Sequence, residues 1–273
     1  MSTADDHDAA VAGAPSELEG VDEFAPPPEA SFVPVRQTHC GVDYLALLSS
    51  VHRHLQPRSY LEIGTHTGDS LRLARCASIA IDPKFKITSD VIGDKPQLQL
   101  YQMTSDAFFR ADHVRAHFPE GIDLAFLDGM HLFEYLLRDF INIEKHAHWR
   151  TVVLMHDCLP PNIEIAERDY RPHLRQDEMW RIYWTGDVWK LLPILKRYRP
   201  DLKLTLFDAP PSGLTMVTGL DPANRVLEDN YASILAEFRD LEFDEASYRE
   251  FYRSLDITPS AGLLHGMALS AFI

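Results

Sequence analysis

Apolar residues between positions 43 and 55 recur with the spacing of one helical face, and Pro57 ends this pattern. Five short apolar segments that read as strands follow, at 59–63, 78–82, 98–102, 122–127 and 151–156. Between them, the apolar spacing predicts helices at 68–76, 105–117 and 132–146. Because strands alternate with helices and several strands are apolar on both faces, we expect an α/β fold with a parallel sheet covered on both sides.

The pattern changes after residue 157, where a polar, proline-containing stretch leads to a predicted helix near 187–198. The segments LKLTLF and GLTMVT come next, and the connection DAPPSG between them is so short that it allows only an antiparallel hairpin. Together these elements predict a doubly wound, Rossmann-like fold whose mostly parallel, seven-stranded sheet ends in that hairpin. Residues 222–273 read as two helices and an apolar tail, GLLHGMALSAFI, which we expect to pack on the core or on a second copy of the chain, so a homo-oligomer stays open.

The composition is that of an ordinary globular protein, with 45% hydrophobic residues and a formal net charge of −15. Such a charge disfavours a nucleic-acid or anionic-membrane partner, so a small-molecule partner is expected. The N-terminus lacks the basic flank and apolar core of a secretion signal, and no apolar run is long enough to span a membrane. We therefore expect a cytoplasmic protein whose three widely spaced cysteines are reduced.

The N-terminal segment is strongly acidic. Residues 1–30 contain eight acidic residues and no Lys or Arg, together with few large apolar groups. This composition predicts a disordered tail over residues 1–38, although an acidic arm with its own function is an alternative. We expect the catalytic domain to span 39–221 and a helical extension to follow at 222–273.

Acidic residues stand at or beside the end of each predicted parallel strand. They are Glu62, Asp82, Asp106, Asp128 and Asp157. Acids are poor strand residues, and the carboxyl ends of parallel strands meet at one edge of a sheet, where ligands bind. The five acids therefore predict a shared binding rim, with the alternative that single members, Asp106 above all, are helix N-caps.

The first strand leads into a turn, Glu62-Ile-Gly64-Thr-His-Thr-Gly68, that lacks the motifs of dinucleotide and phosphate-loop sites. This E-x-G-x-x-x-G pattern, with Asp82 at the next strand end, resembles the class I S-adenosylmethionine-dependent methyltransferases. A first helix, five parallel strands and a terminal hairpin are the architecture that this family implies. The resemblance further implies a cofactor site in which glycine backbone approaches the methionine and ribose, Asp82 accepts the ribose hydroxyls, Asp106 lies near the adenine and Glu62 faces the methionine end. The residues expected to bind the cofactor are Glu62, Gly64, Thr65, Gly68, Asp82 and Asp106.

A second constellation follows the fourth and fifth strands. The spacing Asp128-x-x-His131, followed by Asp157, resembles the metal-dependent small-molecule O-methyltransferases, most closely the macrocin O-methyltransferase group. That resemblance implies Mg²⁺ held by Asp128 and Asp157. Hard carboxylate oxygens suit Mg²⁺ or Mn²⁺, and a bound cation lowers the pKa of a coordinated hydroxyl so that it can attack the methyl group. Where the catechol-like group has a second Asp or Asn, this chain has Cys158 after His156-Asp157, so His156 is the candidate third ligand and could favour a transition metal.

His131 is the preferred general base, acting beside Asp128, because it lies close to the predicted metal and its ordinary pKa is near neutrality. Its alternatives are a metal ligand or a polar contact at a helix start. For Tyr135, Asp139 and Glu144 on the following helix we expect a packing or solvated face.

The stretch 158–186 is expected to cover the acceptor, with an apolar wall made of Trp180, Tyr183 and Trp184. Asp187 reads as the N-cap of the next helix. The function that these features predict is an O-methyltransferase acting on a hydroxyl of a small natural product or sugar. The alternatives are a hydroxylase-like enzyme, since the motifs also resemble cephalosporin hydroxylase, and a non-catalytic protein that binds S-adenosylmethionine.

Overall fold

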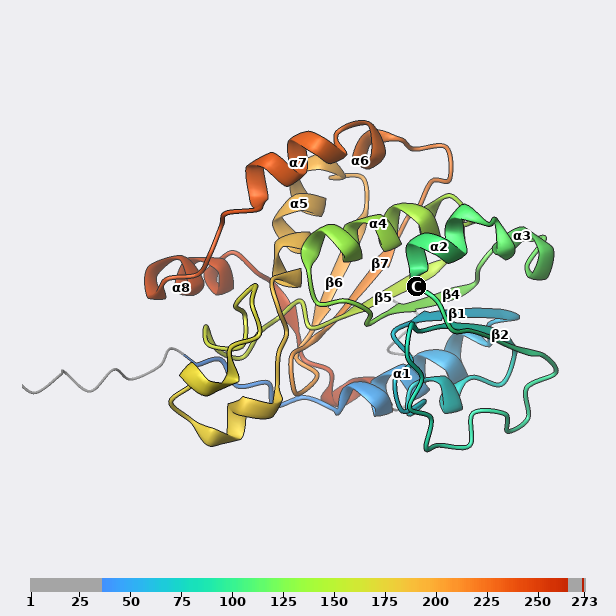
Figure 1. Ribbon diagram of the computed structural model, residues 1–273, viewed down its shortest axis with the longest axis horizontal. Helices are drawn as coiled ribbons and strands as arrows, with labels where there is room; N and C mark the ends of the chain where they lie inside the picture. Colours follow the sequence, from blue (N-terminus) through green and yellow to red (C-terminus); the bar gives the residue numbers. More distant parts are fainter. Residues whose placement is uncertain (1–35, 265–271, 273) are drawn as a thin grey trace, which may run out of the picture. The chain divides into compact units, whose positions relative to one another are not determined.

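One sheet organises the part of the chain that the computed structural model describes, residues 36–264 and 272. Its eight strands run in the order β3-β2-β1-β4-β5-β7-β6-β8 (Figure 1). The parallel strands are β1 (Ser59–Ile63), β2 (Ala77–Ile81), β3 (Leu98–Tyr101), β4 (Leu124–Leu127) and β5 (Val152–His156). The antiparallel hairpin consists of β6 (Lys203–Phe207) and β7 (Leu214–Thr218), and the short β8 (Ile257–Thr258) runs parallel to β6. The predicted fold class is confirmed, and β8 is an eighth strand that the sequence pattern did not indicate.

Most of the predicted helices form near their expected positions. The α-helices of the described residues are α1 (Tyr44–Leu55), α2 (Ser105–Arg110), α3 (His113–His117), α4 (Phe133–Glu144), α5 (Leu191–Tyr198), α6 (Val226–Asp229), α7 (Tyr231–Phe238) and α8 (Glu245–Arg253). The predicted helix at 68–76 is wrong, because Gly68 has a φ of 85° and only a single 3-10 turn, Leu71–Leu73, follows it. The predicted helix at 105–117 is broken into α2 and α3 at Asp112, whose φ is 51°.

The strands divide the core into two layers. Leu61 and Ile63 of β1 pack in a hydrophobic cluster with α4 and α5, whereas Tyr60 packs in a second cluster with α1. Successive strand residues point to opposite faces, so Glu62 lies on the same face of the sheet as Tyr60, the face covered by α1. The hydroxyl of Tyr60 donates a hydrogen bond to Glu62. Figure 1 shows α4 and α5 on one face of the sheet and α1 on the other.

The strand order reverses between β1 and β4, because the chain runs outward through β2 and β3 before returning to β4. At this point the two strand ends come very close: a Cβ added to Gly64 would lie 1.9 Å from the carbonyl oxygen of Asp128, and Gly64 has a φ of 89°. Only glycine fits such a close approach in this conformation. The reversal is where open α/β sheets bind ligands.

The segment after residue 221 packs on the same unit as the sheet and contributes β8 to it. In α8, the hydroxyls of Tyr248 and Tyr252 both donate to the carbonyl of Pro160, at 2.9 and 2.8 Å. Leu263 and Phe272, from the predicted apolar tail, pack in the cluster on the α1 face. Residues 1–35 of the predicted tail and the rest of the apolar tail lie outside the described residues, whereas Arg36 and Gln37 contact the segment near Asn162, and the domain boundaries stay a prediction. No helix among the described residues is long and apolar enough to cross a bilayer.

Candidate functional site

A cavity of about 530 Å³ opens at the carboxyl ends of the central strands. Its size is in the range of small-molecule sites. Residues predicted for the site that line it are Gly64, Asp82, Asp106, Asp128 and His131. The geometry therefore brings the ends of β1, β2 and β4 and the starts of α2 and α4 together, as expected for parallel strands.

Asp82 is buried at the end of β2 and held in one orientation. Its two carboxylate oxygens accept the backbone N–H groups of His66, at 2.8 Å, and Lys84, at 2.6 Å. A carboxylate offers about four acceptor positions, so two are left for a ligand in the cavity that Asp82 lines.

Asp106 also lines the cavity, and Arg138 of α4 holds its carboxylate. The guanidinium donates from Nε to Oδ1 at 2.9 Å and from the terminal nitrogen to Oδ2 at 2.8 Å. The N-cap of α2 is Thr104, whose hydroxyl accepts the N–H of Ala107, so the alternative of Asp106 as an N-cap is wrong. Asp106 is a paired side chain at the cavity wall.

Three of the residues predicted to bind the cofactor do not line this cavity: Glu62, Thr65 and Gly68. Glu62 is fully buried on the α1 face, where Oε2 accepts the Tyr60 hydroxyl at 2.5 Å. Its Oε1 and the Thr65 hydroxyl have no hydrogen-bond partner among the described residues. A Cβ at Gly68 would meet Val91 at 2.4 Å, so this glycine serves the packing of the turn. Direct contact of these three residues with a cofactor stays a prediction.

The candidate metal centre lies at the ends of β4 and β5. One ligand atom each from Asp128, His131 and Asp157 lies within 4.8 Å of the others. Nε2 of His131 is 3.5 Å from Oδ1 of Asp128 and 3.4 Å from Oδ2 of Asp157. Asp157 has a φ of 63°, a left-handed conformation that redirects its side chain after the strand and that Asp tolerates better than most residues.

The orientation of His131 is set by a backbone carbonyl. Its Nδ1–H donates to the carbonyl oxygen of Trp184 at 2.5 Å. Since a carbonyl can only accept, Nδ1 carries the hydrogen, and the lone pair of a neutral ring is on Nε2, facing two carboxylates. Three electron-rich atoms in this arrangement require a positive charge, either a proton on Nε2 or a metal ion. Metal-binding histidines commonly donate their other ring N–H to a backbone carbonyl in this way.

His156, the third ligand suggested by the sequence, occupies a different place. It is buried, its ring lies 4.2 Å from that of Tyr44, and its Nδ1 is 3.3 Å from one oxygen each of Asp128 and Asp157. Ser212 donates its hydroxyl to Asp157 on the same side. The group of side chains that could hold a metal ion together consists of Asp128, His131 and Asp157, and His156 as a ligand stays a prediction.

The electrostatics follow from this crowding. Burial alone would lower the pKa of His131, but Asp157 and Asp128 outweigh it and raise the pKa to about 9. Burial alone would raise the pKa of Asp128 and Asp157, but His156 and His131 outweigh it and hold both below their ordinary values. The two carboxylates are therefore kept ionised and ready to accept a cation.

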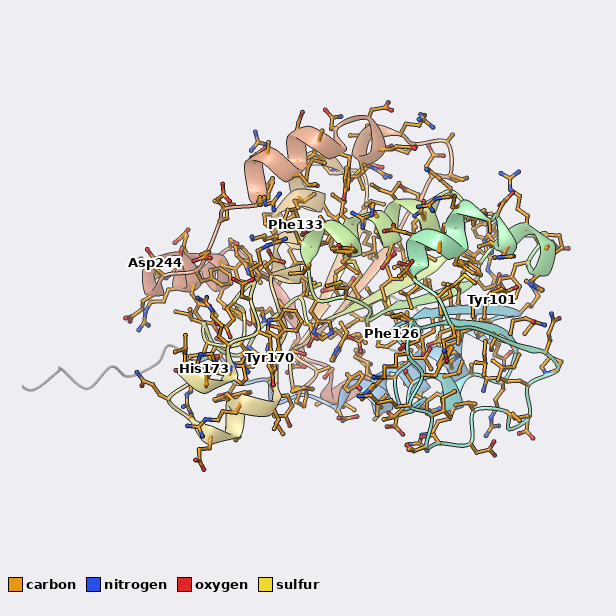
Figure 2. All side chains as sticks on the ribbon, viewed as in Figure 1. Tyr101, Phe126, Phe133, Tyr170, His173 and Asp244 are labelled. Carbon is orange, nitrogen blue, oxygen red and sulfur yellow. The ribbon has the colours of Figure 1, made fainter. Side chains whose placement is uncertain are left out.

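The segment 158–186 returns to this centre at its end. Trp184 lies beside His131, with 5.5 Å between ring centroids, and its indole N–H donates to the Glu167 carbonyl. Trp180 and Tyr183 contact each other, and neither lines the cavity. Figure 2 shows Phe133 at the start of α4, and Tyr170 and His173 within this segment.

Sequence reasoning missed part of the site. Tyr135 and Asp139 of α4 line the cavity, and Asp139 is buried with one carboxylate oxygen lacking a partner among the described residues. Burial raises the pKa of Asp139 to about 7. Asp187 stands at the N-cap position of the 3-10 turn Val188–Lys190, but its side chain makes no capping hydrogen bond there; it accepts the N–H of Phe133 and caps α4. The position of Asp139 within an apolar helical face could have indicated its role from the sequence. No feature of the sequence near Asp187 indicates that its side chain contacts Phe133.

Known proteins are similar in part of the chain. Residues 38–158 match the family described as a methyltransferase domain. The solved structure of the Podospora anserina methyltransferase PaMTH1 is 15% identical, with 64% of this chain and 77% of that chain covered and a TM-score of 0.46. The Streptomyces achromogenes O-methyltransferase TomG is 17% identical, with 64% and 80% covered and a TM-score of 0.45. No curated protein matches the chain.

The match over residues 38–158 covers β1 to β5, the turn at Gly64 and the acids at the strand ends. This part of the chain is therefore similar to the methyltransferase domain, and the sheet of five parallel strands that ends in an antiparallel hairpin has the order that the sequence led us to expect.

Glu62 generates a test of stability against pH. Burial raises its pKa from 4.5 to about 7, so the folded protein binds this proton more tightly than the unfolded chain does. The stability that this proton confers is fully present below pH 4.5 and is lost as the pH rises to about 7. Glu62→Gln stays neutral and can still accept from Tyr60, so it should gain up to ~3 kcal/mol over the wild type across this window. Urea denaturation at a series of pH values measures the difference.

The matched control is Glu120→Gln, whose carboxylate is exposed beside Arg58. Its free energy of unfolding should follow that of the wild type across the same pH range. A difference between Glu62→Gln and the wild type that does not change with pH would show that the folded protein holds Glu62 with an ordinary pKa.

Proposed function

We propose that this protein transfers the methyl group of S-adenosylmethionine to a hydroxyl of a small molecule, with a divalent cation held by Asp128, His131 and Asp157. The observation that carries the proposal is the convergence of these three side chains, two of which, Asp128 and His131, line the cavity. A carboxylate pair with one imidazole is a donor set for a cation, and it lies beside the space in which a cofactor would bind.

The cofactor has a place in the cavity. Asp82 keeps free acceptor positions for two ribose hydroxyls, because its backbone partners occupy only one position on each oxygen. Gly64 lines the cavity between the ends of β1 and β4, where its backbone would contact the methionine portion. Tyr135 and Asp139 form the wall beside Asp106, where the adenine would lie.

The donor set fits a divalent cation with a preference for oxygen. Two carboxylates suit Mg²⁺ or Mn²⁺, and the single imidazole shifts the preference towards Mn²⁺. When bound, such a cation would bring an acceptor hydroxyl to the site and lower its pKa. The chain's own contribution is to keep Asp128 and Asp157 ionised, to orient His131 through Trp184, and to shield the centre with the segment 158–186.

The first test concerns the ribose. Asp82→Ala removes a charged acceptor of two hydroxyl groups, which should lower the affinity for S-adenosylhomocysteine roughly 10- to 100-fold in calorimetric titration. Asp90→Ala is the matched control, because Asp90 is an exposed acid whose side chain accepts the backbone N–H groups of Ile92 and Gly93, away from the cavity. Equal affinity in Asp82→Ala and the wild type would remove Asp82 from the cofactor site.

The second test concerns the reaction. The protein, incubated with S-adenosylmethionine, Mn²⁺ and a panel of catechols, phenols and sugars, should release S-adenosylhomocysteine together with a methyl ether, both measured by mass spectrometry. Excess chelator should abolish this release because the hydroxyl loses its activation. An oxygenated acceptor without S-adenosylhomocysteine would favour the hydroxylase-like alternative, and turnover that survives exhaustive chelation would contradict the metal-assisted mechanism.

The third test separates the two roles of His131. If His131 is a metal ligand, His131→Ala should lower the Mn²⁺ affinity by no less than ~10- to 100-fold. This is the loss seen when a residue that only orients a metal ligand is removed. As a general base, its removal would instead leave the Mn²⁺ affinity intact and lower the rate by roughly 10²- to 10⁴-fold. Calorimetric titration with Mn²⁺ distinguishes these outcomes. His148→Ala is the control, because His148 also contacts an aspartate, Asp123, but outside the candidate centre.

A further inference from the structure

Residues 184–187, at the end of the segment 158–186 and the start of the next helical turn, hold both the ring and the backbone of His131. The Trp184 carbonyl accepts the ring Nδ1–H at 2.5 Å, and the backbone N–H of Asp187 donates to the His131 carbonyl at 3.2 Å. Gly186 packs so closely that an added Cβ would lie 1.7 Å from that same carbonyl oxygen, and its φ is 59°. Both the backbone and the ring of His131 are therefore held by residues 184–187.

The Asp187 carboxylate extends this contact into α4. Its Oδ1 accepts the backbone N–H of Phe133 at 2.9 Å. Leu132, the residue that precedes α4, has no side chain able to cap the helix. A helix start leaves N–H groups without partners inside the helix, so a cap from a distant residue fixes where α4 begins.

Two cations hold the other oxygen of Asp187. Lys190, which is fully buried, donates to Oδ2 at 2.8 Å, and Arg168 donates to it at 2.9 Å. Arg168 also forms a two-pronged ion pair with Glu134 in the first turn of α4. Asp187 therefore joins the covering segment, the start of α4 and the helix that follows, inside a network whose charges are paired.

This network determines the position of the loop that carries His131. Asp128 is held at one end of the loop by its N–H, which donates to the carbonyl of Ile63 in β1, and Phe133 is held at the other end by Asp187. His131 lies between them, with its carbonyl held by the N–H of Asp187. A shift of Asp187 would therefore move both the end of the loop and the histidine itself.

We infer that Asp187 is a positioning residue of the cation site, which holds Nε2 of His131 beside Asp128 and Asp157. This inference rests on the proposed function, because it concerns the cation that those three residues would bind. Asp187 contacts neither carboxylate of the cluster and acts through the backbone of His131 and the cap of α4. Groups that orient a metal ligand in this way commonly change metal affinity when they are removed.

The variants Asp187→Asn and Gly186→Ala test the inference by independent routes. Asn keeps an oxygen to cap Phe133 but loses the charge that holds Lys190 and Arg168. Gly186→Ala leaves every charge in place and pushes on the His131 carbonyl. We expect each variant to lower the Mn²⁺ affinity about 10- to 100-fold in calorimetric titration. The affinity for S-adenosylhomocysteine should stay unchanged, because its proposed ribose site at Asp82 lies on another strand. An unchanged affinity also shows that the variant is folded.

The matched control is Gly219→Ala, which has a comparable φ of 80° but no neighbouring atom closer than 3.7 Å to the added Cβ. It should bind Mn²⁺ as the wild type does. Wild-type Mn²⁺ affinity in folded Gly186→Ala and Asp187→Asn would overturn the role of Asp187 and leave the proposed function standing. If Asp187→Asn does not fold, Gly186→Ala alone decides. No Mn²⁺ binding by the wild-type protein would overturn the proposed cation site and this inference together.

Discussion

Two carboxylates in one small space are the constraint on which the site depends. Asp128 and Asp157 lie at the ends of adjacent parallel strands, so the pairing of β4 with β5 brings them together. Like charges this close repel unless a positive charge lies between them. His156 on one side and His131 on the other meet this requirement, and a divalent cation would meet it with a higher charge.

The sheet separates the chemistry from the packing. The cavity lies at the reversal of strand order, beside the cluster that contains Leu127, α4 and α5, whereas Tyr60 and Glu62 face α1. A buried carboxyl such as Glu62 lowers the stability of the folded protein when it is ionised, because the carboxylate loses its hydration. Its hydrogen bond from Tyr60 reduces that cost.

The covering segment is bound to the centre by polar contacts as well as apolar ones. Trp184 orients the ring of His131, and Asp187 fixes the start of α4 through a network of paired buried charges. Removing one partner from such a network leaves an unpaired buried charge, so its parts depend on one another. A change in the position of the segment 158–186 should therefore change the affinity of the site for a cation. By the same coupling, binding of a cation should change the position of this segment.

The sequence by itself determined the strands and the acids at their ends, because short apolar runs that alternate with helices indicate β1 to β5, and the carboxyl ends of parallel strands lie at one edge of the sheet. It determined that Asp82, Asp106 and Asp128 reach the cavity. It could not determine that His131 and His156 approach the two carboxylates from different sides, because the left-handed Asp157 and the distant Trp184 carbonyl set the directions of these side chains. Only the tertiary structure placed Glu62 on the α1 face and gave the cap of α4 to Asp187, because both depend on which element packs against which.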